Sequence, residues 1–294
     1  MRVLVTGGSG FVGGATVGEL LRRGHTVYAT TTNSAPRPAD HPQLRWLAWD
    51  ACAQPLPDAP WDALDAVLHL AVPRSVAFPA DAGVTFEVTV AATMRLLERA
   101  RTGGVRRFVL GSTGDVLAPA APPAFEADEQ LRPSSFYGTA KANAELLVRA
   151  YAGELSTAIA RIFHPYGPGG DRFLVNRLLA RVRAGEPVRV EGRDGITLNP
   201  LWVDDLAAGL AAAVEGDATG VFHFAGPDMV TLRELLLRMG ALAGVQTRIE
   251  PQPERAPVEC HAGDCRRSAS LLAFAPSVSL GDGLRRLLER PAEA

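Results

Sequence analysis

The sequence predicts an α/β protein with a doubly wound parallel sheet and a small α/β lobe toward the C-terminus. Short apolar runs alternate with helix-like stretches through the first half of the chain, as in βαβ units. A glycine-rich turn joins the first apolar run to the first helix-like stretch. Beyond residue 170 the pattern changes to helices and shorter strands, which indicates the separate lobe.

The expected elements follow this alternation in order along the chain. Apolar runs predict strands at 2–6, 26–30, 44–48, 66–70, 107–111 and 156–163. Helical spacing predicts helices at 10–23, 84–101 and 134–155. A Pro-rich segment at 119–123 predicts a loop before the last of these helices. In the later part we expect helices at 173–184, 203–215, 232–243 and 280–289, and a strand at 221–225.

Composition excludes several classes of protein. The chain has 294 residues, a hydrophobic content of 47% and a formal net charge of −2, without a basic block for nucleic-acid binding. Its apolar runs are too short or too interrupted to span a bilayer, and its first residues lead directly into a strand rather than a secretory signal. The cysteines Cys52, Cys260 and Cys265 lack metal-like spacing, so no residue is assigned to a metal. We therefore expect a cytoplasmic protein.

The glycine-rich turn has the spacing of a dinucleotide-binding motif. Gly7 allows the tight turn, Gly10 lets the backbone approach a pyrophosphate, and Gly13 lets helix and strand pack closely. Glycines also occur in ordinary turns, but these lie between a strand and a helix, as the motif requires. The expected cofactor contacts here are Gly7, Ser9, Gly10, Phe11, Val12 and Gly13. Residues 1–165, completed by about 199–226, are therefore predicted to form a Rossmann domain, and 166–198 with 227–294 a substrate-binding lobe.

The end of the second strand predicts the form of the cofactor. NAD sites usually place Asp or Glu there, whereas this chain has Thr31 and no acid. Arg37 follows and could pair with the 2′-phosphate of NADP, although it could equally be a solvated loop residue. Asp50 could contact the adenine, or be an ordinary surface residue. We predict NADP, with NAD as the alternative.

Lys141 is the only lysine, since every other residue among the 30 Lys and Arg is arginine. Tyr137 lies four residues before it on a predicted helix, so both share a face. An ammonium can lower the pKa of a phenol and bond a ribose, whereas the forked guanidinium of arginine suits that role poorly. The pair is interpreted as catalytic, the alternative being two exposed side chains. Ser112 and Thr113 end a buried strand, where a hydroxyl could hold the reacting oxygen.

Taken together, these motifs resemble the extended short-chain dehydrogenase/reductases, also called NAD-dependent epimerase/dehydratases. The resemblance covers nearly the whole chain and includes TGGSGFVG at 6–13, HLA at 69–71, STGDVLA at 112–118, YGTAK at 137–141, RIFHPYGPG at 161–169 and NPLWVDDLA at 199–207. It implies a triad in which Thr113 holds the oxygen, Tyr137 is the acid/base and Lys141 binds the ribose. It also implies cofactor contacts at His69, Leu70, Ala71, Ile162, His164 and Pro165. The expected substrate-binding residues are Ser75, Ser112, Thr113, Tyr137, His164, Arg172 and Arg177.

Departures from the family pattern narrow the function. Dehydratases of the family carry Asp-Glu directly after the catalytic Thr, where this chain has Gly114 and Asp115, so dehydration is not expected. Members that bind nucleotide-sugars often have Asn and Arg where this chain has His164 and Leu198. Arginines on the helix after Gly170 could replace the lost cation or form a solvated face, namely Arg172, Arg177 and Arg181.

We therefore expect a ketoreductase that transfers hydride at a secondary alcohol or ketone of a sugar or sugar-nucleotide. The alternatives are a sugar epimerase and, more remotely, a non-catalytic dinucleotide-sensing regulator. Helices 84–101 and 134–155 could pair two copies as a homodimer.

Overall fold

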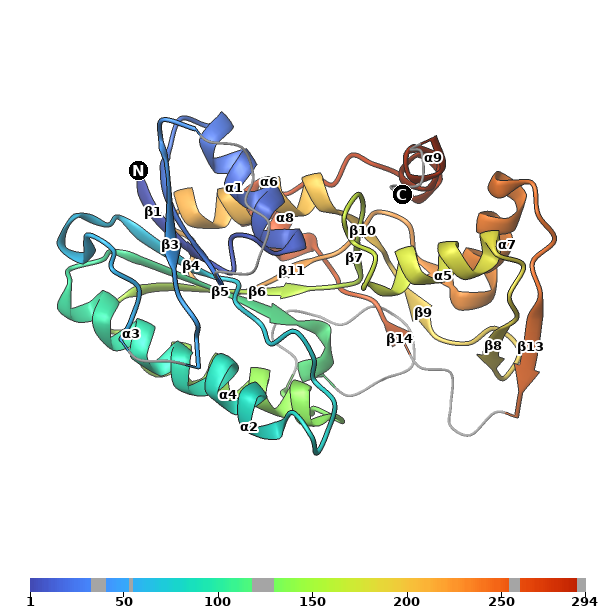
Figure 1. Ribbon diagram of the computed structural model, residues 1–294, viewed down its shortest axis with the longest axis horizontal. Coiled ribbons are helices and arrows are strands. Elements are labelled where there is room, and N and C mark those ends of the chain that lie inside the picture. Colours follow the sequence, from blue (N-terminus) through green and yellow to red (C-terminus); the bar gives the residue numbers. More distant parts are fainter. Residues whose placement is uncertain (33–40, 53–54, 118–129, 254–259, 290–294) are drawn as a thin grey trace.

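The computed structural model describes residues 1–32, 41–52, 55–117, 130–253 and 260–289 (Figure 1). Its centre is a seven-stranded, fully parallel sheet in the order β11-β6-β5-β4-β1-β2-β3. The strands are β1 (Arg2–Thr6), β2 (Thr26–Thr31), β3 (Leu44–Ala48), β4 (Ala66–His69), β5 (Arg107–Thr113), β6 (Ser156–Ile162) and β11 (Gly220–Phe224). The predicted doubly wound α/β fold is confirmed.

The chain reverses its direction of travel across the sheet between β1 and β4. From β1 it proceeds outward to β2 and β3, and from β4 it proceeds the other way to β5 and β6. The connections leaving β1 and β4 therefore diverge at the carboxyl ends of these strands. Such a switch point is where open α/β sheets form a ligand crevice.

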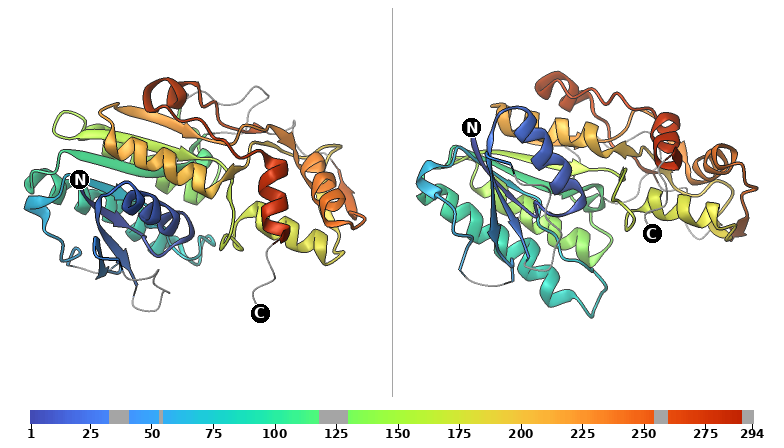
Figure 2. Two further views of the ribbon diagram at one scale, coloured as in Figure 1. Left: turned by 90° about the horizontal axis from the view of Figure 1, so that it is seen from above. Right: turned by 45° about the horizontal axis from the view of Figure 1, so that its top comes forward.

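Helices cover both faces of the sheet (Figures 1 and 2). One apolar layer joins the sheet to α1 (Phe11–Arg22), α6 (Val203–Glu215) and α8 (Arg266–Leu272). The opposite layer joins it to α3 (Ala92–Thr102) and α4 (Phe136–Ala150). A short α2 (Ala82–Phe86) and a π-helical turn, η2 (Glu87–Ala91), run directly into α3, so the predicted helix 84–101 is present with a π segment. The remaining short helices are the 3₁₀ segments η1 (Trp61–Ala63) and η3 (Gly114–Val116).

A second apolar core lies in the C-terminal lobe. Its helices are α5 (Leu174–Arg183), α7 (Leu232–Ala243) and α9 (Leu280–Glu289). Short strands accompany them: β7 (Pro165–Tyr166), β8 (Val188–Glu191), β9 (Thr197–Leu198), β10 (Leu201–Trp202), β12 (Val230–Thr231), β13 (Ile249–Gln252) and β14 (Cys260–His261). Sequence reasoning missed these strands because two to four residues carry too little periodicity.

The boundary between the two parts crosses the C-terminal segment. Leu272 and Phe274 pack in the core of the sheet, while Leu280 and Leu284 pack in the core of the lobe. The predicted start of the last lobe segment at residue 227 stays a prediction. That boundary assigns α8 to the lobe, although Leu272 of α8 packs in the core of the sheet. Among the described residues, no helix is long and apolar enough to cross a membrane.

Candidate active site

The glycine-rich turn leaves a cradle that side chains would fill. Gly7 has φ +70°, and a Cβ there would lie 2.8 Å from the backbone nitrogen of Ala71. A Cβ on Gly13 would lie 2.0 Å from the carbonyl oxygen of Gly7, so only glycine lets α1 approach β1 this closely. No side chain caps the N-terminus of α1, which begins at Phe11. Its free N–H groups and helix dipole suit a phosphate group, so this turn fits a dinucleotide.

Thr6 ties the ends of β1 and β4 together beside this cradle. Its Oγ1 accepts hydrogen bonds from the backbone N–H groups of Leu70 and Ala71, each at 3.2 Å, and lies 2.6 Å from Nδ1 of His69. Burial, together with the nearby charge of Lys141, lowers the pKa of His69 to about 3. The imidazole of His69 is therefore neutral and buried where β1 and β4 end, and the cofactor contact expected at His69 stays a prediction.

The helix α4 presents Tyr137 and Lys141 to the end of β5. Ser135 caps the helix by accepting a hydrogen bond from the N–H of Gly138 at 3.0 Å. Lys141 Nζ is buried and donates to the carbonyl oxygen of Gly111 at 2.8 Å. Burial lowers the pKa of Lys141 to about 8. Burial, and secondarily the charge of Asp115, raises the pKa of Tyr137, so the phenol stays protonated.

Gly138 explains how closely α4 approaches the segment after Thr113. A Cβ at Gly138 would lie 2.2 Å from the carbonyl oxygen of Asp115, which excludes any larger residue in this packing. Thr113 is half-buried, and its Oγ1 accepts a hydrogen bond from the N–H of Asp115 at 3.2 Å. The structure thus brings the helix that carries Tyr137 and Lys141 against the strand end that carries Thr113.

Ser112 does not fit the substrate role expected from the sequence. Its Oγ is buried and donates to Glu145 Oε1 at 2.6 Å, where Arg161 also donates at 3.0 Å. Successive side chains of a strand point to opposite faces, so Ser112 and Thr113 cannot both face one site. We correct the assignment: Ser112 supports a buried ion pair.

The ring of Phe163 packs against Gly114, the residue after Thr113, and leaves no space there for a side chain. A Cβ on Gly114 would lie 2.4 Å from Cε1 of Phe163, and a Cβ on Gly263 would lie 2.5 Å from Cε2 of the same ring. The ring of Phe163 is therefore held between two glycines. An acidic side chain at position 114 would require this ring to move.

His164 follows β6 in a left-handed backbone conformation with φ +43°. Its Nε2 lies 3.0 Å from the carbonyl oxygen of His261, and its own carbonyl oxygen accepts from the N–H of Leu201 at 3.2 Å. Burial and the neighbouring His261 lower the pKa of His164 to about 4. A neutral, hydrogen-bonded imidazole is typical of a wall residue. Ile162 and Pro165 flank this stretch in β6 and β7.

Arg74, from the loop after β4, contacts the end of β2, and sequence reasoning missed this cation. Thr31 is buried and its Oγ1 donates to the carbonyl oxygen of Thr32, so Thr32 is the exposed hydroxyl there. The guanidinium of Arg74 donates to Thr32 Oγ1 at 3.1 Å, although the two residues are 42 positions apart. No local sequence signal links them, because the loop after β4 must fold back to make this contact. Arg37 lies outside the described residues.

Asp50 and Ser75 each have a local partner. Asp50 is exposed, and its Oδ1 accepts from the N–H of Cys52 at 2.9 Å. Ser75 is exposed, and its Oγ donates to Asp81 Oδ2 at 2.5 Å. The described residues contain no group of three or more His, Cys, Asp or Glu that could hold a metal ion.

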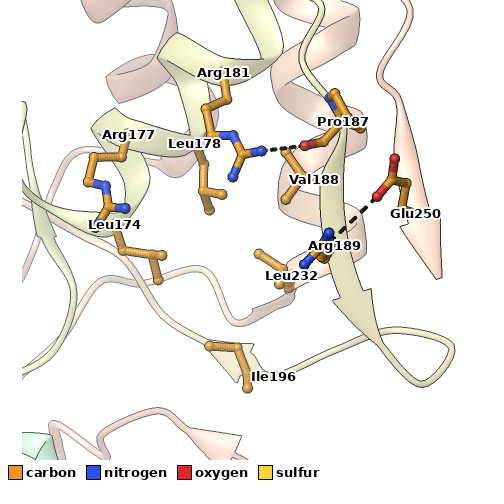
Figure 3. A pocket seen from close by; sticks show the side chains of 10 residues that line it. All are labelled: Leu174, Arg177, Leu178, Arg181, Pro187, Val188, Arg189, Ile196, Leu232 and Glu250. Carbon is orange, nitrogen blue, oxygen red and sulfur yellow. Dashed lines mark hydrogen bonds and ion pairs between the residues drawn. The ribbon is translucent and has the colours of Figure 1, made fainter. Parts of the chain in front are cut away.

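The expected substrate arginines lie in different surroundings. Arg172 donates to the carbonyl oxygen of Arg74, across the two parts of the molecule. Arg177 lines a cavity of about 510 Å³ in the lobe, whereas Arg181 at the same cavity donates to the carbonyl oxygen of Pro187 (Figure 3). The apolar lining consists of Leu174, Leu178, Pro187, Val188, Ile196 and Leu232. The structure therefore separates Arg172 from Arg177.

Known proteins resemble the chain in both sequence and structure. A dTDP-glucose 4,6-dehydratase from Streptomyces venezuelae, solved with NAD, is 27% identical, has a TM-score of 0.85, and is matched over 98% of this chain and 96% of its own. The UDP-glucuronic acid decarboxylase 2 of Arabidopsis thaliana is 30% identical over 97% of this chain, which spans only 66% of that protein. A 3-diazoavenalumate denitrifying reductase from a Streptomyces species is 33% identical over 76% of this chain and 75% of its own length.

A family model places these similarities in one group of enzymes. It describes the NAD dependent epimerase/dehydratase family and matches residues 3–223, which include the glycine cradle, Thr113, Tyr137 and Lys141. The chain belongs to the NAD dependent epimerase/dehydratase family of enzymes.

Proposed function

We propose that this enzyme transfers hydride between a nicotinamide dinucleotide and a secondary alcohol or ketone, and that it acts as a ketoreductase. The dinucleotide supplies or accepts the hydride when it is bound in the glycine cradle. Tyr137 exchanges a proton with the substrate oxygen, Thr113 hydrogen-bonds that oxygen, and Lys141 bonds the ribose and stabilises the phenolate electrostatically. The arrangement of α4 against the end of β5 supports this triad.

One observation favours simple hydride transfer over elimination: Gly114 is packed against Phe163, with no room for a side chain. Elimination needs an acid and a base beside the reacting carbons, and position 114 offers neither.

The substrate class follows from the relatives and the lobe. The relatives named above include enzymes of dTDP-glucose and UDP-glucuronic acid, so a sugar or sugar-nucleotide is the class we propose. Leu198, where such enzymes often carry arginine, is buried in the apolar core of the lobe. Arg181 is bonded to Pro187, and Arg172 to Arg74. Arg177 is therefore our candidate for an anionic group of the substrate.

The cofactor choice remains our own proposal. The solved relative holds NAD, which supports binding of NAD(H) and gives no support to NADP. We nevertheless propose that NADP(H) is preferred in this chain, because the described end of β2 carries no acid and Arg74 reaches Thr32 there. A cytoplasmic location and a homodimer paired through α2–α3 and α4 also remain proposals.

The test compares reduction with epimerisation in the purified protein. dTDP-4-keto-6-deoxyglucose with deuterated NADPH or NADH should give a product alcohol that carries deuterium, with one cofactor oxidised per product. UDP-glucose should not be converted to its 4-epimer. Formation of the 4-epimer without net cofactor consumption would instead establish the rival epimerase. Failure of both reactions in a protein that still binds the dinucleotide, with Lys141 replaceable at no cost in that binding, would favour a regulator.

A further inference from the structure

The buried face of α4 carries one cation and one anion, a single helical turn apart. Lys141 is 2% exposed and Glu145 is 0% exposed. Residues four apart share one face of a helix, and α4 packs against β5 and β6 (Figure 1). The helix has one further charged side chain, Arg149, which lies at the surface. The two buried charges of α4 therefore face the same part of the sheet.

The strand β5 holds both groups through consecutive residues. The carbonyl oxygen of Gly111 accepts a hydrogen bond from Lys141 Nζ at 2.8 Å. The Oγ of Ser112 donates to Glu145 Oε1 at 2.6 Å. The ammonium and the carboxylate are thus fixed at neighbouring residues of one strand, away from water. Charges interact more strongly in such a site, because little solvent screens them.

Arg161 binds the same carboxylate from the next strand. It lies opposite Ser112 in the register of β5 and β6, and its Nε and Nη2 lie 3.0 Å and 2.9 Å from the two oxygens of Glu145. The carboxylate is therefore held in one position. Burial lowers the pKa of Lys141 to about 8, and the charge of Glu145 opposes this effect of burial.

The other titratable groups near Lys141 do not supply a buried anion. His69, from β4, is neutral, and Tyr137, on the same helix, stays protonated. Asp115, from η3, is exposed and acts on Tyr137. The charged residues of η2, α3 and β5 have partners of their own: Glu87 with Arg95, Glu98 with Arg101, Arg99 with the ring of Trp61, and Arg107 with the carbonyl oxygen of Ala213. Among the described residues, Glu145 is the only buried carboxylate.

We propose that Glu145 is a positioning residue that keeps the ammonium of Lys141 charged at neutral pH. This inference rests on the proposed function, in which that ammonium bonds the ribose and stabilises the phenolate of Tyr137. Burial disfavours the charged form, because an ammonium loses its hydration inside the protein. The carboxylate one turn away returns part of this lost stabilisation. Without it, a smaller fraction of the protein would carry the cation that the proposed mechanism needs.

A direct measurement is possible without any substrate, because Lys141 is the only lysine in the chain. Isotope-labelled lysine gives one ε-methylene signal in the NMR spectrum, and its shift against pH reports the pKa of this group. Glu145→Gln removes the charge but keeps an acceptor for Ser112. We expect the pKa of Lys141 to fall by about one unit, a tenfold rise in its acid dissociation constant. Glu145→Asp keeps the charge and should restore most of the wild-type value.

A merely structural role of Glu145 predicts a shift of the opposite sign. If its loss only loosened the packing, water would reach the ammonium and the pKa of Lys141 would rise toward its ordinary value of 10.5. An unchanged or raised pKa in Glu145→Gln would overturn the inference. The matched control is Glu98→Gln, which removes an exposed carboxylate of α3 and should leave the pKa of Lys141 unchanged. An equal fall in this control would also overturn the inference.

A second variant serves if Glu145→Gln does not fold, as judged by circular dichroism. Glu145→Gln combined with Arg161→Met removes both charges, which costs far less stability than breaking a buried ion pair. The pKa of Lys141 should again be lower than in the wild type, and an unchanged or higher value would overturn the inference. If the pKa falls as expected but the protein neither reduces a ketone nor epimerises a sugar-nucleotide, the effect of Glu145 on Lys141 stands and the proposed function fails.

Discussion

Arg161 and Glu145 form an ion pair in which both side chains are 0% exposed and Nη2 lies 2.9 Å from Oε2. The pair joins β6 to α4, and Ser112 adds β5 through its bond to Glu145. Ser112 directly precedes Thr113, and Glu145 follows Lys141 by one helical turn. The ion pair therefore helps to hold the strand end and the helix in one arrangement.

Glu145→Gln tests this support. Loss of the carboxylate breaks the buried ion pair that Arg161 makes with Glu145, so we expect the free energy of unfolding to fall by about 3–5 kcal/mol. Denaturant titration measures the change. The control is Glu98→Gln, which removes the exposed ion pair between Glu98 and Arg101. Loss of that surface pair should lower the free energy of unfolding by less than about 1 kcal/mol. Equal effects of the two changes would contradict the role of the buried pair.

Lys141→Arg should cost turnover severely while keeping the charge. The ammonium occupies a buried site bonded to the Gly111 carbonyl oxygen, which the longer planar guanidinium cannot occupy in the same way. Steady-state kinetics and dinucleotide titration measure the two roles. Activity within a few-fold of the wild type would remove Lys141 from the proposed triad.

The pKa of Lys141 predicts how activity depends on pH. Burial lowers this pKa from 10.5 to about 8, so the folded enzyme loses the ammonium charge as pH rises through that value. The neutral amine no longer stabilises the phenolate of Tyr137, and kcat/KM should therefore fall above pH 8. The unfolded chain keeps this proton up to about pH 10.5, so this group's effect on stability becomes more favourable between the two values. A flat kcat/KM profile from pH 7 to 10 would contradict the electrostatic role.

Tyr137→Phe should slow the chemical step by about a hundredfold or more, because it removes one proton-donating oxygen. Dinucleotide affinity should stay nearly unchanged. Single-turnover measurement of cofactor oxidation separates the two quantities. Intact single-turnover chemistry with weakened cofactor binding would mean that Tyr137 contacts the cofactor rather than the substrate oxygen.

Arg74→Ala should lower the affinity for NADP roughly tenfold and leave NAD nearly unchanged, since one partly exposed contact between arginine and phosphate is worth about 1.4 kcal/mol. Titration of both dinucleotides measures this. Arg37→Ala is the comparison, because the sequence points to Arg37 and the structure to Arg74. Equal or tighter binding of NAD by the wild type would refute the NADP preference and would favour epimerisation over reduction.

The sequence by itself determined the parallel sheet and the positions of the main motifs. Buried parallel strands are continuous apolar runs, which can be recognised in the sequence. The glycines at 7–13 indicate a turn that larger residues cannot form, because a Cβ at Gly13 would lie 2.0 Å from the carbonyl oxygen of Gly7. The sequence also predicted that Tyr137 and Lys141 act together, because residues four apart share one face of a helix.

Tertiary structure decided which of the polar residues at the strand ends face the crevice. Ser112 and Thr113 are adjacent in sequence, yet Ser112 turns to an ion pair formed by Glu145 and Arg161. Arg74 reaches Thr32 across 42 residues, and Phe78 reaches Phe136 across a loop. These contacts depend on how separate segments fold back on one another, and neither periodicity nor local spacing records such long-range packing.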